Sequence, residues 1–117
     1  RDNIMCDQNQ AIIILGEVYR DCNPILGSAI KDAYLYGSYA RGDYHDESDI
    51  DILLTVDISA EAISEVRNSI GSVASELSLK YDITVSITVK PLMQFVQYSD
   101  VLPYYKNIVR EGIKYAS

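Results

Sequence analysis

The stretch YLYGSYARGDYHDESDIDILLTVD, residues 34–57, places two aspartates, Asp49 and Asp51, at the start of an apolar run. Side chains alternate between the two faces of a strand, so these carboxylates would project together while Ile50 points the other way. Their Cα atoms would lie about 7 Å apart, close enough for the charges to repel unless a cation screens them. Paired carboxylates of this kind hold divalent ions that clamp a phosphoryl group, and Mg²⁺ prefers such oxygen ligands.

A Gly-Ser pair, Gly37 and Ser38, stands shortly before the two aspartates. Glycine lets the backbone approach a ligand closely, and a short helix beginning at Ser38 would offer its hydroxyl and free N–H groups to a triphosphate. Arg41 would share a face with Ser38 and offer a planar donor fork to phosphate. Each piece alone is common in structural turns and strand ends. Their combination in one stretch is what indicates chemistry.

The elements that would position these residues follow from apolar spacing and from helix and strand breakers. Strands are expected on either side of the motif and further along, at 33–37, 49–56 and 82–89. Helices are expected at 8–22, 60–79, 91–98 and 103–111, with Asn23-Pro24 ending the first. This order predicts an α+β (mixed α/β) fold in which helices pack on a small sheet.

Length and composition limit the possible classes. At 117 residues the chain is expected to form one domain, residues 1–117. A net charge of −7 argues against nucleic acid as a partner, because that binding needs a basic surface. No apolar run approaches the length of a membrane span. Residues 1–10 lack the apolar core of a secretory signal, and Cys6 and Cys22 are expected to be free thiols, so we expect a cytoplasmic protein.

The sequence GSYARGDYHDESDID, residues 37–51, resembles the signature of the minimal nucleotidyltransferases in the DNA polymerase β-like superfamily. That signature has a Gly-Ser turn, an Ala-Arg-Gly, a short acidic loop, and then Ser-Asp-x-Asp opening a strand. The matching positions are Gly37, Ser38, Ala40, Arg41, Gly42, Ser48, Asp49 and Asp51. The element order fits as well, so the resemblance covers most of the chain and implies a polymerase-β-like fold with a small mixed β-sheet.

The resemblance implies Mg²⁺-dependent nucleotidyl transfer, with two ions during catalysis and ATP or another nucleoside triphosphate as substrate. Contacts with the nucleotide are implied for Gly37, Ser38, Arg41 and Ser48. Metal binding and catalysis are implied for Asp49 and Asp51, together with a third carboxylate on a later strand.

The third carboxylate has two candidate positions. Asp82 is the acid in the third expected strand, and it is the predicted third catalytic and metal-binding residue. Ser86 falls on the same face, about 13 Å further along the strand, and is the alternative. If Ser86 occupies the catalytic position, the general base is missing.

The resemblance also bears on the partner. Small members of this family are paired with helical proteins of the HEPN type, in modules that resemble toxin–antitoxin systems. A protein hydroxyl is therefore the implied acceptor, and AMP from ATP is the implied group. The alternative is a catalytically weak or inactive antitoxin-like subunit that masks a HEPN-type toxin by contact. Asp82 near the other aspartates would favour the enzyme, and Ser86 there would favour the masking subunit.

Overall fold

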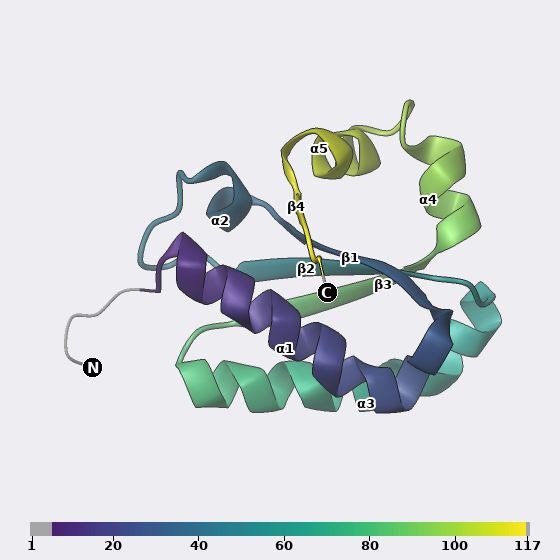
Figure 1. Ribbon diagram of the computed structural model, residues 1–117, viewed down its shortest axis with the longest axis horizontal. Coiled ribbons are helices and arrows are strands. Elements are labelled where there is room, and N and C mark those ends of the chain that lie inside the picture. The colour runs from purple at the N-terminus through teal and green to yellow at the C-terminus, as the bar shows by residue number, and fades with distance from the viewer. Residues whose placement is uncertain (1–5, 117) are drawn as a thin grey trace.

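A computed structural model describes residues 6–116, so residues 1–5 of the N-terminal stretch and residue 117 lie outside the described residues. The helices are α1 (Gln8–Leu26), α2 (Ser38–Arg41), α3 (Ala60–Tyr81), α4 (Leu92–Tyr98) and α5 (Pro103–Glu111), and a 3₁₀ turn η1 (Gly27–Ala29) follows α1. The strands are β1 (Ile30–Tyr36), β2 (Ile50–Val56), β3 (Val85–Pro91) and β4 (Ile113–Lys114). Figure 1 shows their arrangement.

The strands form one sheet in the order β3-β2-β1-β4. β1 pairs antiparallel with both β2 and β4, whereas β2 and β3 are parallel. A parallel pair needs a crossover connection, and α3 provides it by carrying the chain from the end of β2 to the start of β3. The predicted mixed α/β fold with a small mixed sheet is confirmed.

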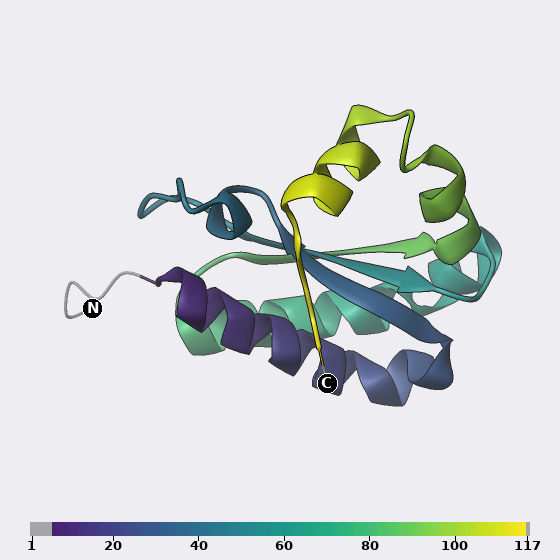
Figure 2. The ribbon, with the colours of Figure 1, turned by 45° about the horizontal axis from the view of Figure 1, so that its top comes forward.

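Helices cover both faces of the sheet, with α1 and α3 on one side and α4 and α5 on the other (Figure 2). Successive side chains of β2 point to opposite faces of the sheet. Ile52 and Leu54 enter the core under α1 and α3, and Leu53 enters the smaller cluster under α4 and α5. That smaller cluster consists of Leu53, Phe95, Tyr105 and Ile108. The sheet therefore has one large packed face and one face that is only partly covered.

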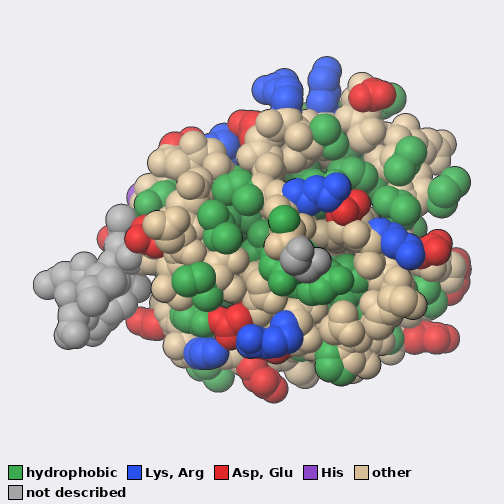
Figure 3. Space-filling view, viewed as in Figure 1, with side chains coloured by type: hydrophobic (Ala, Val, Ile, Leu, Met, Phe, Trp, Pro, Cys, Tyr) green, Lys and Arg blue, Asp and Glu red, His purple; other side chains and the backbone are tan. Residues whose placement is uncertain are grey.

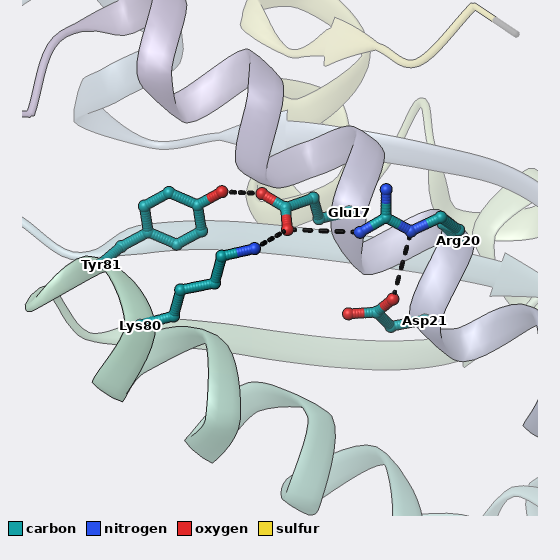
Figure 4. Close-up of polar contacts among 5 residues, drawn as sticks. All are labelled: Glu17, Arg20, Asp21, Lys80 and Tyr81. Atoms are coloured by element: carbon teal, nitrogen blue, oxygen red, sulfur yellow. Dashed lines mark hydrogen bonds and ion pairs between the residues drawn. The ribbon is translucent and has the colours of Figure 1, made fainter.

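A buried carboxylate ties α1 to α3 (Figure 4). Glu17 is only 7% exposed, and its Oε1 lies 2.7 Å from Nζ of Lys80. The hydroxyl of Tyr81 donates to Oε2 of the same carboxylate, and Arg20 donates to Oε1 at 3.3 Å. Burial of a charge is costly unless it is paired and hydrogen-bonded, and both oxygens of Glu17 meet that condition.

The first helix is longer than the sequence predicts. Asn23-Pro24 does not end α1, and that expectation is wrong. Pro24 is exposed in the last turn, where its missing N–H removes one helical hydrogen bond. The helix ends at Gly27, whose φ of 57° is left-handed and whose N–H donates to the carbonyl of Asn23.

The third strand begins later than expected. α3 runs to Tyr81, and Asp82 closes it in the left-handed conformation, with φ 53° and its N–H donating to the carbonyl of Ser78. Aspartate is one of the few residues that tolerate this conformation. β3 therefore starts at Val85 rather than at residue 82, and Asp82 belongs to a helix end.

The other expected helices and strands are present, but β1 begins at Ile30 rather than at residue 33, β2 begins at Ile50 and leaves Asp49 just before the strand, and one strand is additional. The hydroxyl of Ser59 accepts from the N–H of Ala62 at the start of α3, and α5 ends at Glu111. The two-residue strand β4 was not expected; it pairs with β1 next to Tyr34 and Leu35. No helix among residues 6–116 is long and apolar enough to cross a membrane.

The surface combines scattered charge with a few apolar hollows. On the face in Figure 3, acidic side chains are spread out and basic ones lie among them. Apolar side chains gather over α1 and the end of the chain, where Tyr19 stacks on Tyr115 at a centroid distance of 4.8 Å. This stack holds the C-terminal segment against α1.

Candidate active site

The turn after β1 places a glycine against a carboxylate. Gly37 has φ 78° and ψ −155°, a conformation that side chains disfavour. A Cβ added to it would lie 2.7 Å from Oδ2 of Asp51. Any larger residue would therefore have to displace Asp51, so this glycine sets how closely the turn and the carboxylate approach.

The short helix α2 begins at Ser38, as expected, and lasts a single turn before Gly42 ends it with φ 92°. Arg41 is exposed in this turn, and its Nε donates to Oδ2 of Asp43 at 3.3 Å. Ser38 and Arg41 thus lie on one turn beside Gly37. Their contacts with a nucleotide stay predictions.

Two contacts from other elements support this turn. The side-chain amide of Gln8, at the start of α1, donates to the carbonyls of Tyr39 and Ala40 at 2.9 and 3.2 Å. Tyr39 is fully buried and stacks on Tyr44 at a centroid distance of 4.4 Å. Both tyrosines therefore pack beneath the motif rather than lining an open pocket.

Ser48 organises the loop that leads to the aspartates. It is buried, its hydroxyl accepts from the N–H of His45 at 2.9 Å, and its own N–H donates to the carbonyl of His45 at 3.0 Å. Nδ1 of His45 in turn accepts from the N–H of Glu47. Ser48 thus has a clear structural role, and its predicted contact with the nucleotide is not tested.

The two aspartates differ in exposure. Asp49 is exposed just before β2, whereas Asp51 is half-buried inside the strand. Burial raises the pKa of Asp51 above its ordinary value, the charge of Asp49 raises it further, and Arg41 lowers it. The charges of Asp49 and Arg41 therefore both act on the carboxylate of Asp51.

The register of β3 decides which residue flanks Asp51. Ser86 is the direct partner of Asp51 in the parallel pair, and Tyr36 is its partner on β1. Asp82 lies outside β3, at the end of α3. Across the part of the chain that the structure describes, no group of three His, Cys, Asp or Glu side chains is arranged to hold a metal ion. The expected three-acid set with Asp82 is thus not assembled here.

The sequence did not predict a contact between two tyrosines on the face of the sheet that carries Asp51. The hydroxyls of Tyr36 and Tyr104 lie 2.9 Å apart, and their rings meet edge to face. Burial and the hydrogen bond with Tyr36 raise the pKa of Tyr104, while a hydrogen bond with Thr88 lowers it. The alternation that places Asp51 on this face also places Tyr36 there, but nothing in the sequence links Tyr36 to a residue on α5.

A comparison with protein-family models shows to which family this chain belongs. The family model of the nucleotidyltransferase domain matches residues 19–115. This chain belongs to that family. The resemblance inferred from the motif is confirmed, and the match extends from α1 to beyond β4.

Individual relatives agree with the family assignment. A candidate protein adenylyltransferase of Methanocaldococcus jannaschii is 42% identical over 77 residues, which cover 66% of this chain and 76% of that protein. A crystal structure of a candidate nucleotidyltransferase from Sulfolobus solfataricus has a TM-score of 0.52 at 19% identity, covering 97% of this chain and 90% of that one. A crystal structure of a toxin-antitoxin with AMP-PNP has a TM-score of 0.52 at 20% identity, covering 87% of this chain and 73% of that one. The two solved structures share the fold of this nucleotidyltransferase domain.

Proposed function

We propose that this chain is a Mg²⁺-dependent nucleotidyltransferase that moves AMP from ATP to a hydroxyl of a partner protein. The observation that carries the proposal is the Asp49–Asp51 pair, with Asp51 close to Gly37, in a chain of the nucleotidyltransferase family. Support for adenylyl transfer to a protein comes from the M. jannaschii relative, a candidate protein adenylyltransferase.

The acidic residues of the site suit a divalent cation. The charge of Asp49 raises the pKa of Asp51, and a bound cation would relieve that repulsion. Mg²⁺ often takes only one or two protein carboxylates, because substrate phosphates and water complete its coordination. Asp49 and Asp51 would therefore hold it, and the ion when bound supplies the positive charge that neutralises the triphosphate.

The Gly-Ser turn would seat the nucleotide beside these carboxylates. Gly37 leaves room for backbone approach, and Ser38 would offer its hydroxyl to a phosphate oxygen. Arg41 is exposed and close enough to lower the pKa of Asp51, so its guanidinium would reach a phosphate bound there. The turn would therefore orient the α-phosphate toward the acceptor.

The reaction is an in-line displacement at the α-phosphorus of ATP. The acceptor hydroxyl oxygen bonds to that phosphorus, the bond to the bridging oxygen breaks, pyrophosphate leaves, and the hydroxyl proton passes to water. Positioning and charge neutralisation supply most of the catalysis in such a transfer. No residue of the chain needs to form a covalent intermediate.

We infer that the acceptor is a helical protein of the HEPN type, in the cytoplasm where ATP is available. The support is limited to fold likeness, because a toxin-antitoxin with AMP-PNP shares this fold.

One observation favours a second function. Ser86, a residue without a carboxylate, is the direct neighbour of Asp51 on β3. If the reaction requires an acid at that position, the chain would act as a subunit that masks its partner by contact and transfers slowly or not at all.

The test uses ATP labelled at the α-phosphate, Mg²⁺, the purified chain and a helical protein encoded beside it. A parallel reaction contains γ-labelled ATP, and Asp49→Ala/Asp51→Ala is the inactive control. We expect label on the helical protein from the α-labelled nucleotide alone, and none with the control variant. Tight binding of the helical protein without any label would exclude the transferase and favour the masking subunit.

Ser86→Asp separates the two functions further. If Ser86 fills a position that needs an acid, this substitution should increase transfer at least tenfold, as expected for a positioned general base. A decrease in transfer would show that the native site works with the serine. Binding of ATP by both forms, measured by calorimetry, controls for damage to the site.

A further inference from the structure

The sheet has two edge strands, the seven-residue β3 and the two-residue β4, and β3 offers the longer edge. Because β3 lies at the end of the order β3-β2-β1-β4, only one of its sides is paired. The N–H of Ile50 on β2 donates to the carbonyl of Thr84 at 2.9 Å, which fixes the phase of the parallel ladder. Backbone groups alternate in direction along a strand, so Ser86 and Thr88 point theirs toward β2. Ile87 and Val89 point their N–H and carbonyl groups outward.

Both ends of this edge are closed. The N–H of Val85 donates to the hydroxyl of Ser78 at 2.9 Å, and Pro91 has no N–H to offer. Pro91 stands at an outward position, which is where an edge strand accepts proline. The outward N–H groups that remain for an added strand are therefore those of Ile87 and Val89, enough for a short added strand and too few for indiscriminate pairing.

A hollow of about 300 Å³ runs between α3 and this edge. Its apolar lining comes from Ile63, Ile70, Ile87 and Val89, and its charged lining residues are Arg67 and Lys90. Within residues 6–116 neither cation is joined to a carboxylate by an ion pair, although the whole chain carries a net charge of −7. The hollow is thus apolar and basic on an acidic protein.

We propose that the free edge of β3 docks an extended, acidic segment of the acceptor protein by strand addition. Main-chain hydrogen bonds to Ile87 and Val89 supply affinity, and side-chain pockets supply selectivity, as in other cases of strand addition. Apolar side chains of the segment enter the hollow, and acidic ones approach Arg67 and Lys90. The statements that this segment belongs to the acceptor protein and carries the acceptor hydroxyl rest on the proposed function, whereas the docking of an extended, acidic segment does not.

The position of β3 relative to the aspartates makes this docking productive. Neighbouring strands lie about 4.8 Å apart, so an added strand would be roughly 10 Å from β2. Ser86 lies between them, on the same face as Asp51. Every second side chain of the added strand would project on that face, beside Ser86. A tyrosine or another long hydroxyl side chain there can extend across Ser86 toward Asp51.

Charge favours a partner segment over a second copy of this chain. Two copies paired through β3 would bring together two hollows whose charged lining residues, Arg67 and Lys90, are all basic. Like charges at a contact are costly and exclude partners. An acidic segment meets the opposite condition.

The test is fluorescence anisotropy with a labelled peptide of about nine residues, the length of a typical strand. Valine alternates with glutamate in this peptide, and one central glutamate is replaced by tyrosine. Val89→Pro removes an outward N–H, and Val89→Ala is its matched control, because both lose the valine side chain. We expect binding to Val89→Pro to be about tenfold weaker than to Val89→Ala, the loss expected for one hydrogen bond that cannot form.

A charge variant tests the hollow independently. Arg67→Glu/Lys90→Glu should weaken peptide binding at least tenfold, and a lysine-containing version of the peptide should then bind the variant better than the native chain. Lys106→Glu/Arg110→Glu makes the same charge change on α5 and should leave the affinity within about twofold. Thermal unfolding of each variant shows that the fold is retained.

Several results would overturn the docking proposal. These are failure of the acidic peptide to bind, equal binding to Val89→Pro and Val89→Ala, and equal effects of the two charge variants. A dimer in sedimentation that Val89→Pro dissociates would assign the edge to a second copy instead.

Transfer of α-label to the peptide tyrosine is measured separately from binding. Binding without transfer would support docking at β3 and exclude the peptide as an acceptor. Transfer that is equally fast with Val89→Pro and Val89→Ala would support the transferase activity and exclude docking at β3.

Discussion

The two faces of the sheet are built from alternate residues of the same strands, yet they differ in what they hold. Under α1 and α3, β2 contributes Ile50, Ile52, Leu54 and Val56, all fully buried in one continuous core. On the other face the same strand contributes Asp51, Leu53 and Thr55, of which Leu53 alone joins an apolar cluster. Buried apolar residues are therefore concentrated on one face, and the candidate active site lies on the other.

This division explains how a half-buried carboxylate is tolerated in a central strand. Asp51 needs no apolar neighbour on its own face, because Ile50 and Ile52 anchor β2 from the opposite face. A site on a regular strand is also positioned more rigidly than one on a loop. The comparison predicts that substitutions on the two faces will separate activity from stability.

The largest effect is expected where chemistry can be removed without loss of packing. Asp49→Ala/Asp51→Ala should lower nucleotidyl transfer about 1,000-fold, the scale seen when preorganised charge stabilisation is lost. Its melting temperature should not fall, because neither side chain belongs to an apolar cluster. Asp46→Ala/Glu47→Ala, two exposed loop acids, is the matched control and should keep most of the transfer rate. Similar losses in both double variants would contradict a specific role for the strand pair.

Neighbouring leucines compare the two faces directly. Leu53 and Leu54 are both 0% exposed, but they enter different clusters. Leu54→Ala opens a cavity in the larger core and should lower the free energy of unfolding by about 4 kcal/mol. Leu53→Ala lies in a cluster that can relax around the loss, so a decrease of about 2–3 kcal/mol is expected. Urea unfolding measures both, and a larger loss for Leu53→Ala would reverse the assignment of the stabilising face.

Substitutions of two glycines by alanine should have opposite effects on stability. Gly37→Ala forces a Cβ to within 2.7 Å of Asp51 at a φ of 78°, so we expect about 1–2 kcal/mol of destabilisation and loss of transfer. Gly71→Ala lies in α3 with open space around the new Cβ and should instead stabilise by about 1 kcal/mol. Unfolding and transfer assays report both quantities. Full activity in Gly37→Ala would show that the close approach is dispensable.

The smallest expected effect is the change in stability when the charge of Asp51 is removed. The pKa of Asp51 is raised in the folded state by burial and then by Asp49, so folding favours the protonated acid. That stabilisation is complete below the ordinary pKa of aspartate and is lost as pH rises through the raised value. Asp51→Asn should therefore raise the melting temperature by roughly 2–4 °C at neutral pH, and by nothing below about pH 3.

Thermal unfolding across pH without divalent cations checks this expectation. Added Mg²⁺ should stabilise the native chain and leave Asp51→Asn less affected, because only ligand bound to the folded state raises stability. A lower melting temperature for Asp51→Asn at neutral pH would mean that the charged carboxylate is stabilised rather than strained.

Local signals were sufficient to predict most of the fold and the turn and strand that carry the motif. The motif from Gly37 to Asp51 is contiguous, so local patterns placed the short helix at Ser38 and the strand that carries Asp51, although β2 begins at Ile50 and leaves Asp49 just outside it. The strand β3 was misplaced because Ile83 and Thr84 are good strand residues, whereas α3 extends to Tyr81 and Asp82 supplies a left-handed end.

The rest of the site depends on register, which the sequence does not encode locally. The pairing register of β3 with β2 determines whether Ser86 or Asp82 lies beside Asp51. A register shift of a few residues would change every cross-strand neighbour. The contact of Tyr36 with Tyr104 joins residues 68 positions apart. Neither could be derived from spacing alone.

The antiparallel pairing of β1 and β2 also has a consequence for folding order. Tyr36 and Asp51 are cross-strand partners, and the chain between β1 and β2 contains only the short helix α2. The chain between β2 and β3 contains the long helix α3, so pairing β1 with β2 closes the smaller loop and loses less chain entropy. β3 can join only after the long helix α3 has formed and crossed over. The aspartates should thus acquire their β1 neighbours early and Ser86 late. Native-state hydrogen exchange would then reveal an opened form in which β3 is released while the pairing of β1 with β2 persists.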